Sequence, residues 1–317
     1  MHYSLLILAL VSLSTSPVLV KLANAPIEMI CFWRLLIAGF ILQLASLAFP
    51  AMTGGQRLSE PTANNNSSNS GGGAASKKAA FRWALITGFF FFVHLWTFVF
   101  AVQHTTVAHT VILFSTNPIF TYIISQSFLS DAHMNSTTRL KLWISYPLSL
   151  LGILILVSEQ DFLSSSNLKG DVVIVLSAFL HSIYLLASRR ARAGLGNLEA
   201  SKWINWVAGS LFLITALFTG VPLLSDSLQT WLAIGCLIAM PSLMGHTLFT
   251  YLVNHFPVNI LSLSKLIEPI MSMGLAAYLL GEGVTFRIIV SFLVTAFGLS
   301  VLYWPEKLWR RIPFVGR

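Results

Sequence analysis

The feature that most constrains this chain is a series of apolar runs, each about as long as a membrane is thick. A helix needs roughly 20 apolar residues to cross the hydrocarbon core of a bilayer. Ten such runs occur in the 317 residues, and most connections between them are short. The pattern predicts an all-α polytopic membrane protein with ten transmembrane helices. The predicted spans are 3–23, 27–49, 82–103, 105–128, 141–158, 171–188, 203–221, 229–251, 258–280 and 286–304.

The composition excludes several classes of protein. Charged residues make up 9% of the chain and apolar residues 56%, whereas a soluble domain carries about a quarter charged residues. Too little polar surface is present to cover a globule in water, which argues against a soluble enzyme, a nucleic-acid binder and a disordered scaffold. The expected partners are therefore the lipid bilayer and a small-molecule substrate, with no nucleic acid.

The positive charges are distributed unevenly between the two sides of the membrane. Ten spans place both termini on one side, and 14 of the 19 Lys and Arg residues fall there, against three on the other side and two within spans. Lys and Arg collect on the cytoplasmic side of membrane proteins. Both termini are therefore predicted to be cytoplasmic.

Two segments stand outside the predicted spans. Residues 53–80 contain a run of Asn, Ser and Gly and are predicted to form a flexible cytoplasmic loop, and residues 305–317 a basic cytoplasmic tail. The two cysteines, Cys31 and Cys236, both lie in apolar runs, so no disulfide or metal framework is expected.

The sequence contains a weak internal repeat. A shift of 151 residues brings similar residues together from the third span to the loop after the fourth, including Pro118 with Pro269 and Asp131 with Glu282. Residues 1–158 and 171–304 would then each hold five spans. Because five is odd, the two halves must run through the membrane in opposite directions. Two inverted five-helix repeats are the architecture of many secondary transporters.

Several short motifs occur in the order known from one family. They are Ser16-Pro17-Val18-Leu19, Phe32-Trp33-Arg34-Leu35-Leu36-Ile37-Ala38, Thr116-Asn117-Pro118-Ile119-Phe120, Gly170-Asp171, Glu268-Pro269-Ile270 and Leu279-Leu280-Gly281-Glu282, together with Gly152 and Gly298. With these motifs the chain resembles the drug/metabolite transporter superfamily, EamA type, over nearly its whole length. It departs from the family in the long loop 53–80 and in its many histidines.

The resemblance implies a ten-helix carrier of small metabolites, often an exporter in the bacterial inner membrane, with no cofactor. It does not imply a substrate. An amino acid or a related polar or aromatic solute is one expectation, and a nucleotide, nucleoside or nucleotide sugar is the alternative.

Polar residues within the spans mark a candidate substrate site, since such groups are costly in a bilayer. Ser264, Lys265, Glu268 and Ser272 share one face of the ninth span, and Pro269 interrupts its backbone hydrogen bonds. Asn117 and Pro118 hold the equivalent place in the fourth span, which predicts a polar path between these two helices. The alternative is that Lys265 and Glu268 form an ion pair with a purely structural role.

Other side chains extend this site. Glu268 is a candidate proton carrier, as are His94 and His181, although a lone histidine in a span is more often a packing residue. Trp96 and Tyr184 are candidates to line a cavity for a planar substrate. Arg34 is expected to extend toward the membrane interface or to pair with a carboxylate.

Competing functions find less support. No Walker A motif is present, no histidine spacing suits a metal site, and Gly298-Leu299-Ser300 matches a serine hydrolase only formally. An intramembrane enzyme is therefore the weaker alternative. A homodimer stays open as a partner, although no GxxxG pair within a span marks a dimer face.

Overall fold

The computed structural model describes residues 2–48, 71–128, 136–157, 168–246, 248, 264, 267–301 and 304. These residues form helices and, within those ranges, no strand. The helices are α1 (His2–Ser14), α2 (Ser16–Ala23), α3 (Ile27–Ala48), α4 (Gly71–His104), α5 (Val107–Phe114), α6 (Asn117–Phe128), α7 (Ser136–Val157), α8 (Leu168–Leu195), α9 (Asn197–Thr219), α10 (Leu228–Leu237), the π-helix η2 (Ile238–His246), α13 (Ile267–Leu280) and α14 (Phe286–Val301).

Most of these helices are apolar along their length. Among the described residues, six helical stretches are long and apolar enough to cross a membrane, namely Tyr3–Ala23, Ile27–Ala48, Lys77–His104, Leu168–Leu195, Asn197–Thr219 and Leu228–Gly245. Shorter apolar helices cover Trp143–Ile155, Ile267–Leu280 and Phe286–Val301. The prediction of an all-helical protein with many membrane spans is confirmed. The inverted relation of the two halves stays a prediction.

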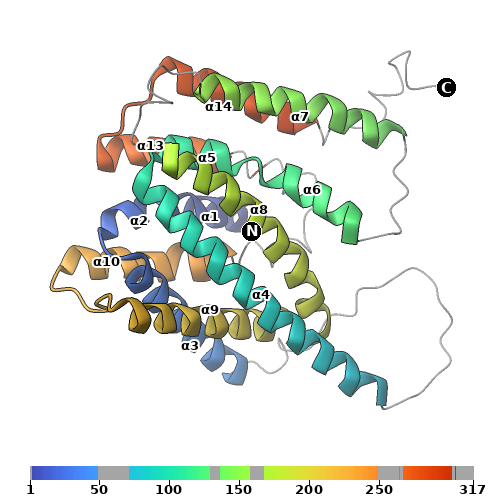
Figure 1. Ribbon diagram of the computed structural model, residues 1–317, viewed down its shortest axis with the longest axis vertical. Helices are drawn as coiled ribbons and strands as arrows, with labels where there is room; N and C mark the ends of the chain where they lie inside the picture. The colour runs from blue at the N-terminus through green and yellow to red at the C-terminus, as the bar shows by residue number, and fades with distance from the viewer. Residues whose placement is uncertain are drawn as a thin grey trace.

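The helices lie roughly side by side, and their connections gather at two opposite ends of the bundle (Figure 1). At one end α2 meets α3, α4 meets α5, α9 meets α10 and α13 meets α14. We call this the Lys21 end. At the opposite end α8 meets α9 and α4 begins, and we call this the Arg192 end.

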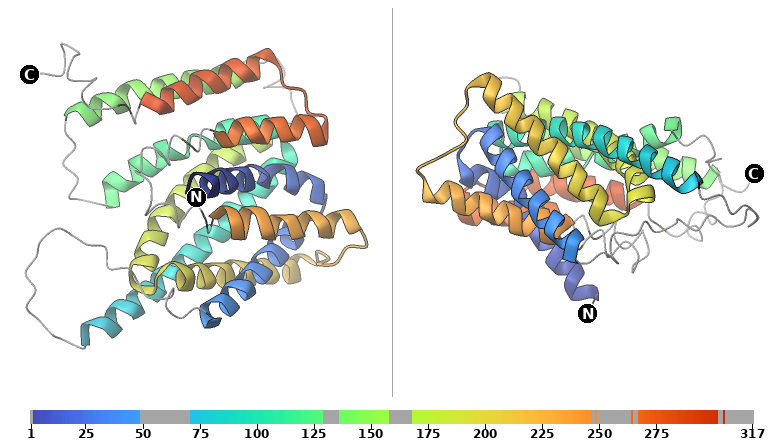
Figure 2. Two further views of the ribbon diagram at one scale, coloured as in Figure 1. Left: turned by 180° about the vertical axis from the view of Figure 1, so that it is seen from behind. Right: turned by 90° about the horizontal axis from the view of Figure 1, so that it is seen from below.

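α4 runs through the middle of the bundle, packed along α8 and α9, while α3 packs on the other side of α9. α7 and α14 form a separate pair along one edge, which is seen from both sides of the molecule (Figures 1 and 2). The pair touches the rest of the bundle mainly through α5. The centre of the protein is therefore built by α3, α4, α8 and α9.

Glycines allow α7 and α14 to approach closely. A Cβ atom on Gly152 would lie 2.6 Å from the backbone nitrogen of Thr295, and one on Gly298 would lie 2.6 Å from that of Ser149. The contact also contains a hydrogen bond from the Ser291 hydroxyl to the Gly152 carbonyl, at 2.7 Å. Small residues at helix contacts in membranes allow this kind of backbone approach.

Two predicted spans are broken within the bundle. The span 3–23 is interrupted at Thr15, between α1 and α2, where Pro17 lies in the first turn of α2. The span 105–128 is interrupted at Ser115 and Thr116, just before Asn117 and Pro118. Proline lacks a backbone N–H group, so each break lies where an intrahelical hydrogen bond is lost.

The long predicted loop is also shorter than expected. α4 begins at Gly71, so residues 71–80 of the predicted loop 53–80 are helical. Alanine and lysine dominate after the three glycines, and both are strong helix formers. The spans are predicted from runs of apolar residues, and such runs do not reveal a polar extension of a helix. The rest of the predicted loop, residues 53–70, lies outside the described residues. The predicted tail 305–317 lies outside them as well.

Candidate functional site

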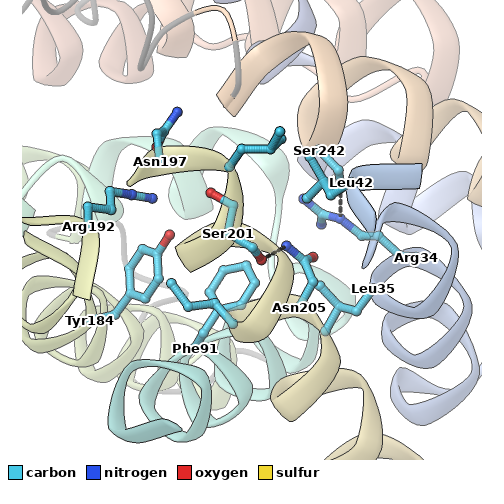
Figure 3. A pocket seen from close by; sticks show the side chains of 12 residues that line it. Arg34, Leu35, Leu42, Phe91, Tyr184, Arg192, Asn197, Ser201, Asn205 and Ser242 are labelled. Carbon is cyan, nitrogen blue, oxygen red and sulfur yellow. Dashed lines mark hydrogen bonds between the residues drawn. The ribbon is translucent and has the colours of Figure 1, made fainter. Parts of the chain in front are cut away.

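A small cavity of about 60 Å³ lies among α3, α4, α8, α9 and η2 (Figure 3). The wall combines charged, amide, hydroxyl and apolar side chains. The lining residues are Arg34, Leu35, Leu42, Phe91, Tyr184, Arg192, Asn197, Leu198, Ser201, Ile204, Asn205 and Ser242.

Arg34 of α3 is the most deeply buried charged group in this wall, with 3% of its surface exposed. Its Nε donates a hydrogen bond to the Ser242 hydroxyl at 2.8 Å. That hydroxyl in turn donates to the Leu237 carbonyl, five residues earlier, at 2.9 Å. The π-helical turn of η2 thus positions the hydroxyl that orients Arg34, and π-helical turns are frequent at functional sites.

The opposite wall is built by the end of α8 and the start of α9. Arg192 donates through a terminal nitrogen to the Ser188 hydroxyl at 3.1 Å, and the Asn205 amide donates to the Ser201 carbonyl at 2.8 Å. Within the described part of the chain, Nε of Arg192 and Oδ1 of Asn197 are buried and have no hydrogen-bond partner. Such atoms are available to a ligand or to water.

An aromatic and histidine cluster adjoins the cavity between α4 and α8. The Tyr184 ring, in the cavity wall, stacks on Phe91 with centroids 4.8 Å apart. His181 lies next to it, with ring centroids 5.4 Å apart, and His94 lies 4.8 Å from His181. The structure thus brings together three residues singled out from the sequence. His94 is held by hydrogen bonding of Nδ1 with the Ser177 hydroxyl at 2.9 Å.

Asn117, the first residue of α6, contacts α8. Its amide donates to the Ala178 carbonyl and to the Ser182 hydroxyl of α8, each at 2.8 Å. Thr121, one turn further along α6, donates to the same hydroxyl at 3.0 Å. The polar face of α6 is therefore turned to α8. Pro118, the second residue of α6, follows the helix break directly.

The candidate residues around α13 do not join this cavity in the described structure. Ser272 is buried, and its hydroxyl donates to the Ser14 carbonyl at the break between α1 and α2, at 2.7 Å. Glu268 and Pro269 form the first turn of α13, and Ser264 is half-buried. Lys265 lies outside the described residues, so its pairing with Glu268 stays a prediction.

Trp96 is also absent from the cavity wall. Its ring stacks on Phe100 with centroids 5.4 Å apart and an angle of 11°, and it packs at the edge of the largest apolar cluster. Its expected contact with a substrate stays a prediction.

The Lys21 end is held together by an ion pair. Lys21 of α2 contacts Glu282, just after α13, at 2.6 Å. The second carboxylate oxygen of Glu282 accepts a hydrogen bond from the backbone nitrogen of Val107, the first residue of α5, at 2.7 Å. A carboxylate is favoured at the positive N-terminus of a helix. One side chain thus connects three elements at this end.

A second carboxylate connects α8 to the start of α5. Asp171 accepts a hydrogen bond from the Thr105 hydroxyl at 2.6 Å and contacts Nδ1 of His109 at 2.8 Å. The backbones approach closely here, since a Cβ atom on Gly170 would lie 2.7 Å from the His104 carbonyl oxygen. In the sequence, Gly170-Asp171 and Glu282 stand out only as parts of motifs, and the pairing of Asp131 with Glu282 in the internal repeat is the one signal for a role.

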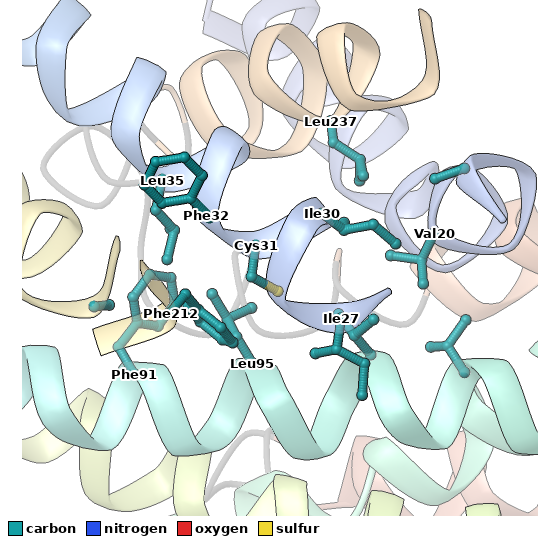
Figure 4. Close-up of a cluster of buried hydrophobic side chains, with 14 of the residues drawn as sticks. Val20, Ile27, Ile30, Cys31, Phe32, Leu35, Phe91, Leu95, Phe212 and Leu237 are labelled. Carbon is teal, nitrogen blue, oxygen red and sulfur yellow. The ribbon is translucent and has the colours of Figure 1, made fainter. Parts of the chain in front are cut away.

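An apolar cluster fills the space between the cavity and the Lys21 end (Figure 4). It begins at Val20 and Ile27, near Lys21, and reaches Leu35 and Phe91, which also line the cavity. Behind the ion pair of Lys21, the side chains of Val18, Val107 and Ala276 form a smaller cluster. The cavity is thus separated from the Lys21 end by packed side chains and ionic contacts.

Apolar helices of membrane-spanning length are typical of a multi-pass membrane protein, and a small cavity lies among five of the described helices. The chain belongs to the EamA-like transporter family, whose family model matches residues 1–158 and again residues 168–304. It is therefore a membrane transporter, as its resemblance to that family implied.

Two other proteins are similar to this chain. The chain is similar to the uncharacterized transporter YdfC of Bacillus subtilis (strain 168), with 25% identity over 193 residues, which is 61% of this chain and 61% of that protein. A protein of known crystal structure shares the fold with a TM-score of 0.60, at 15% identity over 98% of both chains.

Proposed function

We propose that this protein is a secondary transporter that exports a small polar or aromatic metabolite from the bacterial cytoplasm across the inner membrane by alternating access. The observation that carries the proposal is the asymmetry of the bundle. A polar cavity reaches toward the Arg192 end, while ionic contacts and apolar packing lie between it and the Lys21 end.

The two halves of the chain supply the proposed exchange between states. The family model matches twice, and each match holds five predicted spans. Two inverted halves can exchange conformations, so that each end of the bundle opens in turn. The excess of Lys and Arg on the side of the termini supports a cytoplasmic position for the Arg192 end. The structure would then correspond to a state loaded from the cytoplasm.

The candidate residues receive roles in this cycle. Tyr184 lines the cavity, and Asn117 contacts α8 two residues before it, so both are assigned to the substrate path. Ser264, Lys265, Glu268, Ser272 and Trp96 are assigned to contacts in the other state. Glu268 is the first candidate for proton coupling, with His94 and His181 as alternatives, and no metal or cofactor takes part.

The size of the cavity bears on the substrate. Sites for drug-sized ligands measure roughly 300–1,000 Å³, whereas this cavity measures about 60 Å³. A small solute is therefore favoured over a nucleotide or a nucleotide sugar.

Proteoliposomes test the proposal. Uptake and efflux are measured for a panel of amino acids, nucleosides and small aromatic acids, with and without a pH gradient, for the wild type and the Glu268→Gln variant. Flux that needs the gradient and is lost in the folded variant supports coupling through Glu268. Gradient-independent flux that survives the substitution indicates facilitated diffusion. Absence of flux for every solute contradicts the transport proposal.

A further inference from the structure

We propose that the cavity binds the carboxylate of a small organic anion, with Arg34 as its main partner and Arg192 as a second cation on the opposite wall. The inference rests on the proposed transport function and narrows its substrate from polar and aromatic solutes in general to anions. It follows from the charge, the hydrogen bonding and the apolar surface of the lining residues.

The charge of the cavity is of one sign. Both charged side chains in its wall, Arg34 and Arg192, are cations, and no carboxylate of the described residues lines it. None of the ion pairs formed within the described ranges involves either arginine. Burying a cation without a counter-ion is costly, and more so within a membrane. A bound anion would supply the missing charge.

Arg34 presents free hydrogen-bond donors to such an anion. A guanidinium carries five N–H donors, and among the described residues the only hydrogen bond of the Arg34 side chain runs from Nε to Ser242. The bond fixes the plane of the group and leaves its two terminal nitrogens available. A carboxylate accepts two parallel hydrogen bonds from a guanidinium. Figure 3 shows Arg34 and Arg192 on different sides of the lining, with Ser201 between them in that view.

A single negative charge fits better than a phosphate. One guanidinium with 3% of its surface exposed balances one charge, and the side chains around it are largely apolar, among them Leu35, Leu42 and Ile204. Burying the double charge of a phosphate among these apolar side chains would cost more than burying the single charge of a carboxylate. The stacked rings of Phe91 and Tyr184 offer a flat surface to the body of the substrate.

A zwitterion fits less well than a simple anion. Its ammonium group would enter a cavity whose described wall offers two cations and no carboxylate. Like charges that are close together in a site of low polarity repel each other. The expected order of affinity is therefore organic anion, then neutral solute and zwitterion, then cation.

A matched series of phenyl compounds tests this order. Phenylacetate, phenylacetamide, phenylalanine, phenethylamine and benzylphosphonate share one ring and differ in charge. Binding to the purified full-length protein is measured by the shift in its unfolding temperature over a range of concentrations, and flux by counterflow in proteoliposomes. We expect phenylacetate to bind at least ten-fold more tightly than each of the others.

Three variants assign the effect to the cavity. Arg34→Gln should weaken binding of phenylacetate at least ten-fold, and Arg34→Lys by less, because the charge is kept. Arg287→Gln removes a positive charge from an exposed position in α14 and should leave binding unchanged. If Arg34→Gln does not fold, Arg192→Gln provides the test, with an expected loss of about three-fold or more.

The possible outcomes distinguish failure of the anion-binding inference from failure of the proposed transport function. Equal binding of phenylacetamide, tighter binding of benzylphosphonate, no binding of phenylacetate, or unchanged binding in a folded Arg34→Gln or Arg192→Gln protein overturns the inference. In each case, flux of any other solute of the wider panel leaves the transport function standing. Absence of flux for every solute, charged or neutral, overturns the transport function itself.

Discussion

At the scale of single residues, the contact between α6 and α8 depends on a few shared hydroxyl and amide groups. Ser182 accepts hydrogen bonds from Asn117 and Thr121 and donates in turn to the Ala178 and Asn117 carbonyls. Hydrogen bonds between helices in membranes contribute about 0.6 kcal/mol each on average, and at most about 1.7 kcal/mol.

We therefore expect a measurable coupling between Asn117 and Ser182. In a double-mutant cycle of Asn117→Ala and Ser182→Ala, the two substitutions should be non-additive by about 0.6–1.7 kcal/mol in the free energy of unfolding. Reversible unfolding in mixed micelles provides the measurement. Additive effects within error would mean that the two side chains are not bonded to each other.

Arg34 shows what a single sequence leaves open at this scale. Its position within an apolar run marked it as unusual, but the expectation was an interfacial or structural role. Its partner, Ser242, lies 208 residues away in the chain, and only the packing of η2 against α3 brings the two together. The same holds for Asn117, whose partner Ser182 in α8 lies 65 residues away in the chain.

At the scale of the helices, the contact between α7 and α14 depends on its glycines. A Cβ atom on Gly298 would lie 2.6 Å from both the nitrogen and the hydroxyl of Ser149, so the two backbones would have to separate. Gly298→Ala should therefore lower the free energy of unfolding by about 1–3 kcal/mol, the usual cost of overpacking.

Gly274 offers the matched control for this substitution. A Cβ atom at this position in α13 would meet nothing within 4 Å, and alanine is favoured over glycine in a helix by roughly 1 kcal/mol. Gly274→Ala should be neutral or stabilising in the same assay. Equal destabilisation by both substitutions would contradict the proposed close contact.

The contacts of Glu282 predict how the Lys21 end opens. Glu282→Gln removes the charge that holds Lys21 and weakens the bond to the N-terminus of α5. A loss of about 1–2 kcal/mol would shift the populations of the closed and open states about 5- to 30-fold. A cysteine at Ala276, which is 1% exposed and packs behind the ion pair, should then react correspondingly faster with a membrane-impermeant maleimide.

The control for this experiment removes a charge from the same end of the bundle. Asp226 is exposed in the connection between α9 and α10, so Asp226→Asn should leave the labelling rate unchanged. If Glu282→Gln behaves like this control, the ion pair does not hold the Lys21 end closed.

The helix breaks mark the limit of prediction at the scale of elements. The apolar runs predicted the positions of the long helices because burial in lipid demands them. The breaks at Thr15 and at Ser115–Thr116 lie near prolines that sequence analysis did note. Whether a proline bends, breaks or merely begins a helix depends on neighbouring groups, such as the Ser272 hydroxyl that binds the Ser14 carbonyl.

At the scale of the whole molecule, the asymmetry of the bundle is the basis of the proposed transport cycle. The family and the all-helical, multi-span character of the chain could be predicted from the sequence, because both depend on local composition and on motifs in a fixed order. The number of ten spans stays a prediction. The cavity could not be predicted, because its wall joins residues from α3, α4, α8, α9 and η2, which are far apart in the chain.

The most direct test is to fill the cavity with a large side chain and to measure whether transport stops. Ser201→Trp places a large side chain into the cavity wall of α9, and Leu217→Trp places the same side chain on the outer surface of the same helix, where Leu217 is 73% exposed. Counterflow of any solute that the wild type carries is measured in proteoliposomes for both folded variants. The account predicts that Ser201→Trp abolishes flux and that Leu217→Trp preserves it. Wild-type flux through a folded Ser201→Trp protein would contradict the assignment of this cavity to the transport path.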